Sequence, residues 1–542
     1  MPNKIENRTF DLREWQKEAY RKIISYANSG KKDFLCVATP GAGKTKLALT
    51  VAHSLLKANF CQRIVIVTPT EGLKKQWALE AAEFAGIDID PDFTNSQEQE
   101  TYDFHGIVIT YAMLGQDKKL VNKKAVDSRK TFVIFDEIHH AGDNLTWGNA
   151  IRKAFENANF RLAISGTAFR SDDNPIPFIT YNENNISVAD YTYSYERAIK
   201  ENVCRPVYFC SFNGKMKWKV EAQEFEHSFE DYLTPDQQSR RLRTALDPKG
   251  QWIRDVIKAA DNKLNDIRRE HHNAAGLIFA STQKDAKEIA KVVEQLTNKK
   301  PAIVISDDPV ASDILDEFKH NNDKWIVSVK MVSEGVDIPR LRVGVYLTII
   351  KAELFFRQAV GRFVRVLKDL SAQDAFIFLP QDKDMIKLAE NIQIEREHAL
   401  DEAERKSNNS FSSSGDAGFD LFGNPYYKPA LKGRFVPLES LATNQKTISV
   451  NVEINSGARH TIDSRKPLEQ NPVFMQKEIL RSKLNTLAKK IALKRNNGSK
   501  TKPDWELAHK LWIKERSGRK MELETIEELK KRLLFYEFLL RN

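Results

Sequence analysis

Ten short runs of β-branched and other apolar residues, in two groups of five, constrain the fold more than any other feature of this chain. Helix-length or loop-length sequence separates each run from the next. Runs of this kind are typical of strands buried on both faces of a parallel sheet. The pattern therefore predicts two successive α/β lobes. The runs are DFLCVATP, RIVIVTP, GIVITY, TFVIFDE and RLAISGT in the first group, and GLIFAS, PAIVIS, WIVSVK, RVGVYLTII and DAFIFLP in the second.

Four segments are expected along the chain, because 542 residues exceed what one hydrophobic core can organise. CRPVYFCSF at residues 204–212 is a candidate first strand of the second lobe, and TISVNVEI at residues 447–454 alternates like a half-buried strand. The expected segments are an N-terminal lobe at residues 1–205, a second lobe at 206–385 with a helical insertion at about 228–272, a charged helix and Ser/Gly/Asn-rich linker at 386–425, and a basic, mainly helical accessory region at 426–542.

The composition indicates a soluble globular protein, with 41% hydrophobic and 29% charged residues. No apolar run is long enough to span a bilayer, and the N-terminal sequence MPNKIENRTFDLREWQKEAY lacks the apolar core of a secretion signal. A cytoplasmic location without membrane contact is therefore expected. The net charge of +10 permits a polyanionic partner without proving one.

The four cysteines, Cys36, Cys61, Cys204 and Cys210, form no CxxC pair and have no His partners at zinc spacing. Neither a disulfide framework nor a structural zinc site is expected. We interpret them as buried or incidental thiols.

The segment ATPGAGKT, residues 38–45, directly follows the first predicted strand and resembles a phosphate-binding loop. Gly41 and Gly43 would let backbone N–H groups curl around phosphate oxygens, at the positive end of the following helix. Lys44 would neutralise the β- and γ-phosphates, and the Thr45 hydroxyl would bind Mg²⁺. Ala38 stands where such loops usually have glycine, and a chance Gly-rich turn is the alternative. The flanking strand and helix favour nucleotide binding.

The segment TFVIFDEIHH ends a predicted strand with two carboxylates, at the place where a doubly wound sheet holds its ligands. Asp136 would reach the metal ion, and Glu137 would polarise the attacking water. His139 follows on the same turn and would sense the γ-phosphate. A solvated acidic pair and a structural histidine are the alternatives, and the preceding phosphate-binding loop favours the catalytic reading.

The segment FFRQAVGRFVR, residues 355–365, spaces Gln358, Arg362 and Arg365 four and three residues apart. On a helix, this spacing puts the three polar residues along one face and the apolar residues opposite. A solvated surface helix explains the segment taken by itself. If another segment of the chain binds an anion, the two arginines could instead contact that anion.

Six segments resemble the motifs of the DExH type of superfamily 2 helicases and translocases, and they follow that family's order over roughly residues 10–385. Their joint occurrence is much more specific than any one of them. LREWQKEA upstream resembles the family's short Arg-x-x-Gln motif, although Leu12, Trp15, Ala19 and Ile23 also form the apolar stripe of an ordinary amphipathic helix. The six segments are AxxGxGKT (38–45), TPT (68–70), DEIH (136–139), SGT (165–167), EGVD (334–337) and QAVGRFVR (358–365).

The resemblance implies two tandem RecA-like lobes with ATP and Mg²⁺ between them, and it gives the matching residues roles. Lys44, Asp136, Glu137, Gln358, Arg362 and Arg365 would carry catalysis, with Thr45 and Asp136 holding the metal. The nucleotide would lie against Arg13, Gln16, Pro40, Gly41, Ala42, Gly43, Lys44, Thr45, Gly335 and Asp337. His139, Ser165 and Thr167 would couple the two lobes. Nucleic acid would contact Thr68, Pro69, Thr70, Lys74, Thr110 and Tyr111, although Lys74 and Lys75 also fit ordinary exposed charges on a helix.

The motifs are closer to those of repair and restriction-type translocases than to those of DEAD-box RNA enzymes. The expected function is that of an ATP-dependent DNA helicase or double-stranded DNA translocase, in DNA repair or antiphage defence. An RNA helicase with the same motor and a nucleotide-gated DNA-binding subunit of a restriction or defence assembly remain alternatives. The basic helical tail, residues 465–500, suits an accessory duplex-binding module, a docking site for a protein partner, or a solvated helical bundle.

Overall fold

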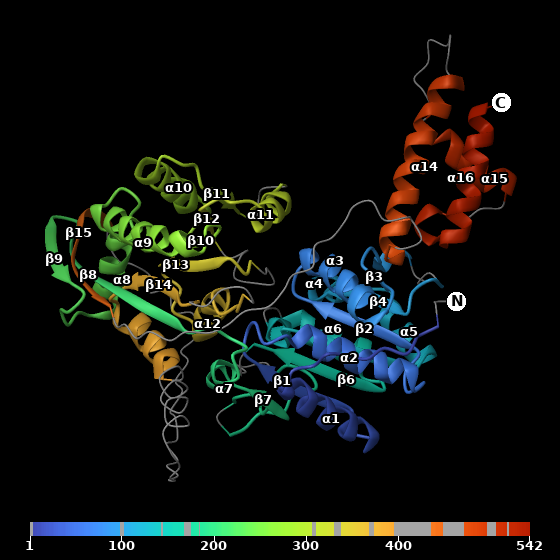
Figure 1. The fold of residues 1–542 in the computed structure, drawn as a ribbon, viewed down its shortest axis with the longest axis horizontal. Helices are drawn as coiled ribbons and strands as arrows, with labels where there is room; N and C mark the ends of the chain where they lie inside the picture. The colour runs from blue at the N-terminus through green and yellow to red at the C-terminus, as the bar shows by residue number, and fades with distance from the viewer. Residues whose placement is uncertain are drawn as a thin grey trace. The chain divides into compact units, whose positions relative to one another are not determined.

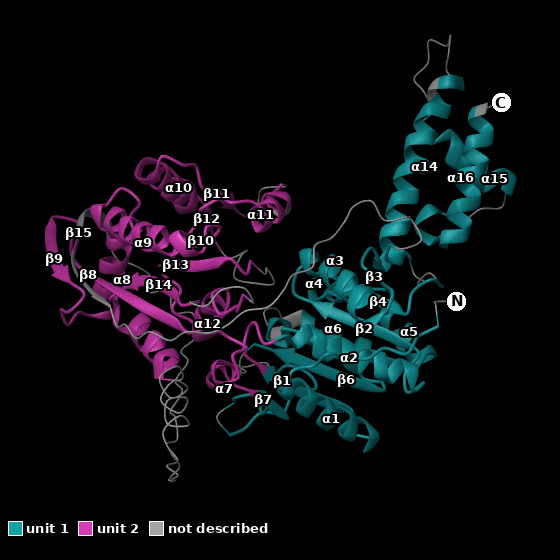
Figure 2. Ribbon diagram, in the orientation of Figure 1, with its two compact units in different colours: residues 1–37, 43–192, 461–542 teal, residues 38–42, 193–460 magenta. Residues whose placement is uncertain are grey.

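The computed structural model falls into two compact units, which Figure 2 colours separately. Unit 1 comprises residues 1–37, 43–192 and 461–542, and unit 2 comprises residues 38–42 and 193–460. Thr167, Gly335, Asp337 and most of the predicted linker and 447–454 strand lie outside the described residues. The structure describes residues 4–97, 102–142, 145–166, 175–183, 185–305, 310–329, 338–367, 373–394, 435–447, 471–495, 504, 506–516 and 520–541.

Unit 1 is built on a seven-stranded sheet with the order β3-β4-β2-β5-β6-β1-β7 (Figure 1). The strands are β1 (Asp33–Ala38), β2 (Arg63–Thr68), β3 (Ile89–Asp90), β4 (Gly106–Thr110), β5 (Thr131–Asp136), β6 (Phe160–Ser165) and β7 (Tyr191–Tyr193). The helices before residue 193 are α1 (Glu14–Asn28), α2 (Lys44–Lys57), α3 (Glu71–Glu80), α4 (Tyr111–Gly115), α5 (Val121–Ser128) and α6 (Leu145–Phe155), with short turns η1 (Ala81–Ala85), η2 (Asn95–Gln97) and η3 (Ile138–Gly142).

The register of the central strands brings the predicted motifs to one edge of this sheet. β1, β5, β2 and β4 run parallel to their neighbours, with Val37 opposite Ser165, Asp136 opposite Ile164 and Thr68 opposite Thr110. Since the carboxyl ends of parallel strands meet at one edge, the residues that follow these strands share that edge. All five strands predicted for the first lobe are confirmed.

Unit 2 contains an eight-stranded sheet with the order β11-β12-β10-β13-β14-β8-β15, in which β9 also pairs with β8. Its strands are β8 (Val207–Val220), β9 (Gln223–Ser228), β10 (Ala275–Ala280), β11 (Ala302–Val304), β12 (Trp325–Ser328), β13 (Leu341–Leu347), β14 (Ala375–Pro380) and β15 (Phe435–Thr447). Its helices are α7 (Tyr195–Lys200), α8 (Pro235–Ala245), α9 (Gln251–Glu270), α10 (Gln283–Thr297), α11 (Ala311–His320) and α12 (Glu353–Gly361), and residues 383–394 are also helical.

The five strands predicted for the second lobe and the strand predicted in CRPVYFCSF are confirmed. β8 runs parallel to β14 along Val207–Phe212, then continues and pairs in the antiparallel sense with β9 and β15. β15 was not predicted from the sequence. Its ladder partner lies more than two hundred residues away, so no local turn signal announces the pairing.

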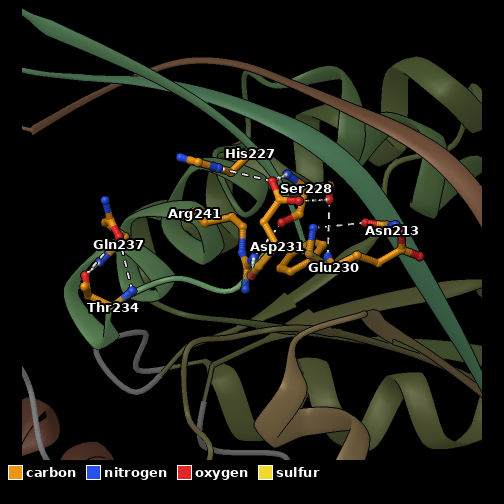
Figure 3. Close-up of polar contacts among 9 residues, drawn as sticks. Asn213, His227, Ser228, Glu230, Asp231, Thr234, Gln237 and Arg241 are labelled. Atoms are coloured by element: carbon orange, nitrogen blue, oxygen red, sulfur yellow. Dashed lines mark hydrogen bonds and ion pairs between the residues drawn. The ribbon is translucent and has the colours of Figure 1, made fainter.

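A hydrogen-bonded turn joins β9 to α8 inside the predicted helical insertion (Figure 3). The Asp231 carboxylate accepts hydrogen bonds from Ser228 N at 2.9 Å and His227 Nδ1 at 3.1 Å. Arg241 on α8 donates to the Asp231 carbonyl at 3.1 Å, and Thr234 and Gln237 form a capping box at the start of α8. The turn therefore fixes the direction of α8, and the bonds of Asp231 lower its pKa, with Ser228 N the largest contributor.

The C-terminal part of unit 1 is a bundle of three helices, α14 (Val473–Arg495), α15 (Leu507–Arg516) and α16 (Ile526–Arg541), with the short turn η6 (Met521–Leu523) (Figure 1). Its apolar core includes Leu484, Ile491 and Leu529. A buried ion pair joins Glu524 to Arg532 at 3.2 Å, and Trp512 Nε1 donates to Glu524 at 2.6 Å. The predicted helical C-terminal region is thus present, and the fold class of two RecA-like lobes with a helical appendage is confirmed.

The bundle packs on the β3–β4 side of unit 1 through α14. Lys477 is buried and lies 2.9 Å from Asp103 and 4.6 Å from the ring of Phe104. Ile526 N donates to the same Asp103 carboxylate at 3.1 Å. Arg481 lies 3.5 Å from Asp92, and the exposed pair between Lys75 and Glu478 measures 3.3 Å.

Two further features bear on the sequence expectations. All four cysteines lie in the described part of the chain, where each is a buried free thiol. No helix among the described residues is long and apolar enough to cross a membrane.

We predict that Asp103→Ala loosens the attachment of the bundle. The substitution strands the buried Lys477 ammonium and the Ile526 amide, and uncompensated charges of this kind cost about 3 kcal/mol. Amide hydrogen exchange should show faster exchange at residues 473–480 and 526–530. Glu478→Ala is the control, because it removes an exposed pair worth at most about 1 kcal/mol. Equal effects of the two variants would contradict the assignment of Asp103 as the docking residue.

Candidate nucleotide-binding site

The turn between β1 and α2 has the backbone of a phosphate-binding loop. Gly41 has φ of 83° and Gly43 has φ of 96°, a left-handed conformation that residues with a Cβ adopt at a cost. Gly43 is the N-cap of α2, which begins at Lys44. The first amides of α2 therefore point out of a glycine turn at the positive end of a helix, a suitable place for an anion.

Lys44 and Glu137 face each other at the carboxyl edge of the unit 1 sheet. Lys44 Nζ lies 3.1 Å from Glu137 Oε1, and Gly166 N donates to Glu137 Oε2 at 2.9 Å. Glu137 has φ of 46°, which is unusual for a residue with a side chain and costs about 1–3 kcal/mol. Burial would raise the pKa of Glu137, but Lys44, His139 and the Gly166 amide together hold it low. The carboxylate therefore stays ionised at neutral pH.

Asp136 is held from two sides by buried aromatic residues. Trp77 Nε1 donates to Asp136 Oδ2 at 2.8 Å, and the Tyr111 hydroxyl donates to the Asp136 carbonyl at 2.9 Å. Burial and the neighbouring Glu137 raise the pKa of Asp136, against the smaller opposing effects of Trp77 and Lys44. Trp77 was not singled out in the sequence, where it reads only as an apolar residue of the helix after TPT.

Asp136 and Thr45 offer the oxygen donors that Mg²⁺ prefers. Burial and the adjacent Glu137 raise the pKa of Asp136, and a bound cation would oppose both effects by favouring the carboxylate. Within the described ranges, no group of three or more His, Cys, Asp or Glu is placed to hold a metal ion. Asp136 and Thr45 could hold a Mg²⁺ ion whose other ligands are phosphate oxygens and water, as is usual for Mg²⁺ bound with a nucleotide.

His139 and Ser165 form a buried link from the acidic segment to the end of β6. His139 Nδ1 lies 3.1 Å from Ser165 Oγ and 3.6 Å from Glu137 Oε2. Ser165 is fully buried. The structure thus brings together two of the three residues expected to couple the lobes, and the third, Thr167, lies outside the described residues.

Arg13 and Gln16 lie at the start of α1, beside the glycine turn. Gln16 Nε2 donates to the Gly43 carbonyl at 2.9 Å, and Gln16 Oε1 accepts from Arg13 N at 2.9 Å. Trp15 and Ala19 on the same helix are fully buried. The helix therefore packs by its apolar stripe and also places Gln16 against the loop.

The residues expected to contact nucleic acid lie at the ends of β2 and β4. Thr70 is the N-cap of α3, and the Thr110 hydroxyl caps α4 by accepting from Met113 N. Lys74 is buried and pairs with Glu71 at 3.2 Å, whereas Lys75 is exposed. Tyr111 is fully buried and bonds Asp136. Thr68 is also buried, and Pro69 follows it at the same edge.

The helix expected over Phe355–Arg365 ends earlier than the spacing predicts. α12 ends at Gly361, so Gln358 lies on the helix, Arg362 is its C-cap, and Arg365 pairs with Cys204 in a β-bridge. The expectation of one helical face for all three residues is therefore wrong. The last residue of the helix has to be small, because a Cβ at Gly361 would come within 2.4 Å of Pro40. Arg365 Nη1 donates to the Gly41 carbonyl at 3.4 Å, inside unit 2.

Arg205 holds the segment that carries these arginines, and the sequence analysis missed it. Its side chain is 1% exposed and donates to the carbonyls of Phe363, Pro339 and Leu341. Its backbone N donates to Val364 O at 2.9 Å. The one available signal was a charged residue directly before proline at the start of an apolar run.

We predict that Arg205→Met destabilises the segment from Arg362 to Arg365. Two buried carbonyls and one partly buried carbonyl lose a charged donor, and each loss at a buried carbonyl costs about 1–3 kcal/mol. Hydrogen exchange at residues 362–365 should accelerate, and Arg205→Lys should restore part of the protection. Arg197→Met is the control, because its pair with Glu201 on α7 is partly exposed. Protection unchanged in Arg205→Met would contradict this role.

Two family descriptions match the chain. Residues 9–170 match the family described as the type III restriction enzyme, res subunit. Residues 257–367 match the family described as the helicase conserved C-terminal domain. The first match covers the glycine turn and the acidic pair, and the second covers α12 with Arg362 and Arg365.

Two curated relatives differ in similarity. An uncharacterised protein of Mycobacterium tuberculosis is 43% identical over 401 residues, which are 73% of this chain and 65% of that protein. The chain thus matches slightly less than two thirds of the length of this relative. A protein of Sulfurisphaera tokodaii named DNA 3'-5' translocase XPB2 is 21% identical over 385 residues, which are 66% of this chain and 79% of that protein.

A solved structure supports the fold. It is a fragment assigned to the HsdR subunit of a type I restriction enzyme from Vibrio vulnificus, with a TM-score of 0.50 and 16% identity, covering 70% of this chain and 66% of that one. At this identity the likeness concerns the fold. The two family matches and the motif geometry lead to one assignment. Residues 9–170 and 257–367 belong to superfamily 2 of the helicases and translocases, and the first of these two matches is to a restriction-enzyme family.

Proposed function

We propose that the chain is an ATP-dependent DNA helicase or double-stranded DNA translocase that couples ATP hydrolysis to movement on DNA or to its remodelling. The observation that carries the proposal is the 3.1 Å contact between Lys44 and Glu137 at the end of the glycine turn. It puts a cation suited to phosphate beside a carboxylate suited to orienting water. The superfamily 2 assignment of residues 9–170 and 257–367 supports the same conclusion.

In this proposal, ATP with Mg²⁺ supplies the phosphoryl group and a cation that neutralises its oxygens. Lys44 binds the β- and γ-phosphates, while Thr45 and Asp136 hold the cation. Pro40, Gly41, Ala42 and Gly43 form the turn around the phosphates, and Gln16 and Arg13 take the adenine side.

Glu137 is the residue that we propose to orient the attacking water. It stays bonded to Gly166 N when Lys44 turns to the phosphates, so its carboxylate keeps a fixed direction. The low pKa of Glu137 keeps the carboxylate ready to accept a hydrogen bond from water. The presence or absence of the γ-phosphate is coupled to the rest of the motor by three residues, His139, Ser165 and Thr167.

Arg362 and Arg365 stabilise negative charge on the γ-phosphate in this proposal, with Gln358, Gly335 and Asp337 serving the same step. Guanidinium groups that reach a transferring phosphoryl group accelerate hydrolysis by about 10³–10⁵-fold. The anchoring of Phe363 and Val364 by Arg205 supports this role, because it fixes the backbone between the two arginines.

DNA is the proposed nucleic acid, and the proposed contact is the sheet edge formed by Thr68, Pro69, Thr70, Lys74, Thr110 and Tyr111. Pro69 and Thr70 are partly exposed there, and the buried Thr68, Lys74, Thr110 and Tyr111 support the backbone behind them. The two threonines that cap helices after β2 and β4 place backbone amides at one sheet edge, where phosphates bind without sequence readout. Use in restriction, repair or antiphage defence is proposed from the family group. The ATP hydrolysis assay described below also tests the two alternatives, an RNA helicase and a nucleotide-gated DNA-binding subunit.

We predict that Glu137→Gln lowers DNA-stimulated ATPase activity by about 10²–10⁴-fold, because the amide keeps the Gly166 bond but cannot act as a base. ATP binding should survive. Lys44→Ala should weaken ATP binding, and Arg362→Ala should lower hydrolysis by about 10³-fold with ATP still bound. Steady-state hydrolysis and binding of a fluorescent ATP analogue check these outcomes.

Arg357→Ala is the matched control for Arg362→Ala, since Arg357 lies on α12 and pairs with Glu353 at 2.9 Å. Its activity should equal that of the wild type. Single-stranded DNA, duplex DNA, forked DNA and duplex RNA are compared at one salt concentration. Wild-type hydrolysis in Arg362→Ala would contradict the role of this arginine. If only RNA stimulates hydrolysis, the substrate is RNA and the proposal of DNA is wrong. If hydrolysis depends on Glu137 but no nucleic acid changes its rate, the proposal of a nucleic-acid motor is wrong.

A further inference from the structure

Two buried aromatic side chains reach Asp136 from two different helices. Trp77 on α3 is 2% exposed, and its Nε1 donates to Asp136 Oδ2 at 2.8 Å. Tyr111, the first residue of α4, is fully buried, and its hydroxyl donates to the Asp136 carbonyl at 2.9 Å. The N–H of a buried tryptophan and the O–H of a buried tyrosine need a hydrogen-bond partner. Here both partners are atoms of Asp136, so two helices are hydrogen-bonded to one residue of the acidic pair.

Both helices begin at the sheet edge that the proposed function assigns to DNA. α3 follows β2 and α4 follows β4, and these strands are parallel neighbours with Thr68 opposite Thr110. Thr70, the N-cap of α3, is partly exposed at this edge. Trp77 lies seven residues farther along α3, or about 10 Å along the helix axis. A shift of either helix by bound DNA would therefore move a hydrogen-bond donor of Asp136.

The bond from Trp77 orients a carboxylate. A carboxylate that binds a metal ion through one oxygen is held in direction by the hydrogen bonds of its other oxygen. Trp77 bonds Oδ2, and the proposed function gives Asp136 the cation. Trp77 is thus placed to fix the direction in which Asp136 presents its ligand oxygen.

The bond from Tyr111 fixes a peptide group. The Asp136 carbonyl belongs to the peptide unit that joins Asp136 to Glu137, and Glu137 has the left-handed φ of 46°. A residue in this conformation keeps it only when its surroundings hold it there. Tyr111 therefore positions the backbone directly before the carboxylate that is proposed to orient water.

We propose that Trp77 and Tyr111 are positioning residues that transmit DNA binding at the unit 1 sheet edge to Asp136 and Glu137. DNA that shifts α3 changes the direction of the Asp136 carboxylate through Trp77. DNA that shifts the end of β4 and the start of α4 changes the peptide before Glu137 through Tyr111. The inference rests on the proposed function, which assigns the DNA contact and the roles of both carboxylates, and it adds the residues that connect them.

The test measures binding, because two coupled sites change each other's affinity by the same factor. The coupling factor is the change in affinity for a DNA duplex when a nonhydrolysable ATP analogue with Mg²⁺ is added, at one salt concentration. For the full wild-type chain we expect a factor of about 5–150. In Trp77→Phe, which keeps an aromatic ring and loses the donor, the factor should approach one. A role in packing alone would lower stability and leave the factor unchanged.

A second readout tests the orientation of Asp136 without DNA. The magnesium gain is the affinity for the ATP analogue with Mg²⁺ divided by its affinity with EDTA. Trp77→Phe should lower this gain by about 10-fold, because the loss of a hydrogen bond to a metal ligand weakens metal binding by about 10–100-fold. The affinity measured with EDTA should stay at the wild-type value.

Tyr111→Phe should separate the two bonds. It keeps the bond from Trp77 to Asp136, so its magnesium gain should equal that of the wild type. Its DNA-stimulated ATP hydrolysis at saturating ATP should fall by about 10–100-fold with little change in KM, because the carboxylate that orients water is misplaced.

Two matched variants in unit 2 serve as controls. Trp325 is also 2% exposed and donates through Nε1 to Asp261 at 2.7 Å, so Trp325→Phe loses the same kind of bond. Tyr346 is 1% exposed and donates to the Ile350 carbonyl at 2.8 Å, so Tyr346→Phe matches Tyr111→Phe. Both controls should keep the coupling factor and the magnesium gain of the wild type.

The outcomes distinguish this inference from the proposed function. If DNA stimulates the wild type and Trp77→Phe keeps its coupling factor, the inference is overturned and the motor stands. Equal losses in Trp77→Phe and Trp325→Phe also overturn the inference, because they show a general effect on stability. If no nucleic acid changes ATP hydrolysis by the wild type, the motor is overturned, and the inference with it.

Discussion

The parallel register of the unit 1 sheet is the constraint on which the rest of the site depends. Pairing Val37 with Ser165 and Asp136 with Ile164 brings the glycine turn, the acidic pair and the end of β6 to one edge. Lys44, the first residue after the glycine turn, then meets Glu137 at 3.1 Å. The left-handed backbone at Glu137 costs about 1–3 kcal/mol, and the bonds from Lys44 and Gly166 N offset that cost at the residue proposed to orient water.

In unit 2, one buried arginine fixes the position of a backbone segment. Arg205 bonds three carbonyls and leaves Arg362 and Arg365 on either side of the anchored residues Phe363 and Val364. The last residue of α12 is Gly361, where a Cβ would come within 2.4 Å of Pro40. A motif that resembles a continuous helical face in the sequence is thus a helix end followed by an extended, pinned segment.

The sequence predicted the ten core strands because their apolar runs report burial directly, and it predicted the acidic pair because strand ends collect ligands. It missed Trp77 and Arg205, whose roles depend on contacts with Asp136 and Phe363 that no local spacing encodes. It also missed β15, whose partner β8 is distant along the chain. The end of α12 at Gly361 was missed for the same reason, since the segment that follows it pairs with Cys204 and Arg205, which are distant along the chain.

The central claim is that hydrolysis by Lys44, Asp136 and Glu137 drives movement along duplex DNA. The most direct measurement is displacement of a fluorescent third strand from a DNA triplex by the full chain with ATP, at a fixed salt concentration. Displacement by the wild type that requires ATP and disappears in Glu137→Gln is the result that this account predicts. ATP hydrolysis at full rate on the same DNA, without displacement of the third strand or separation of a forked duplex, would contradict it.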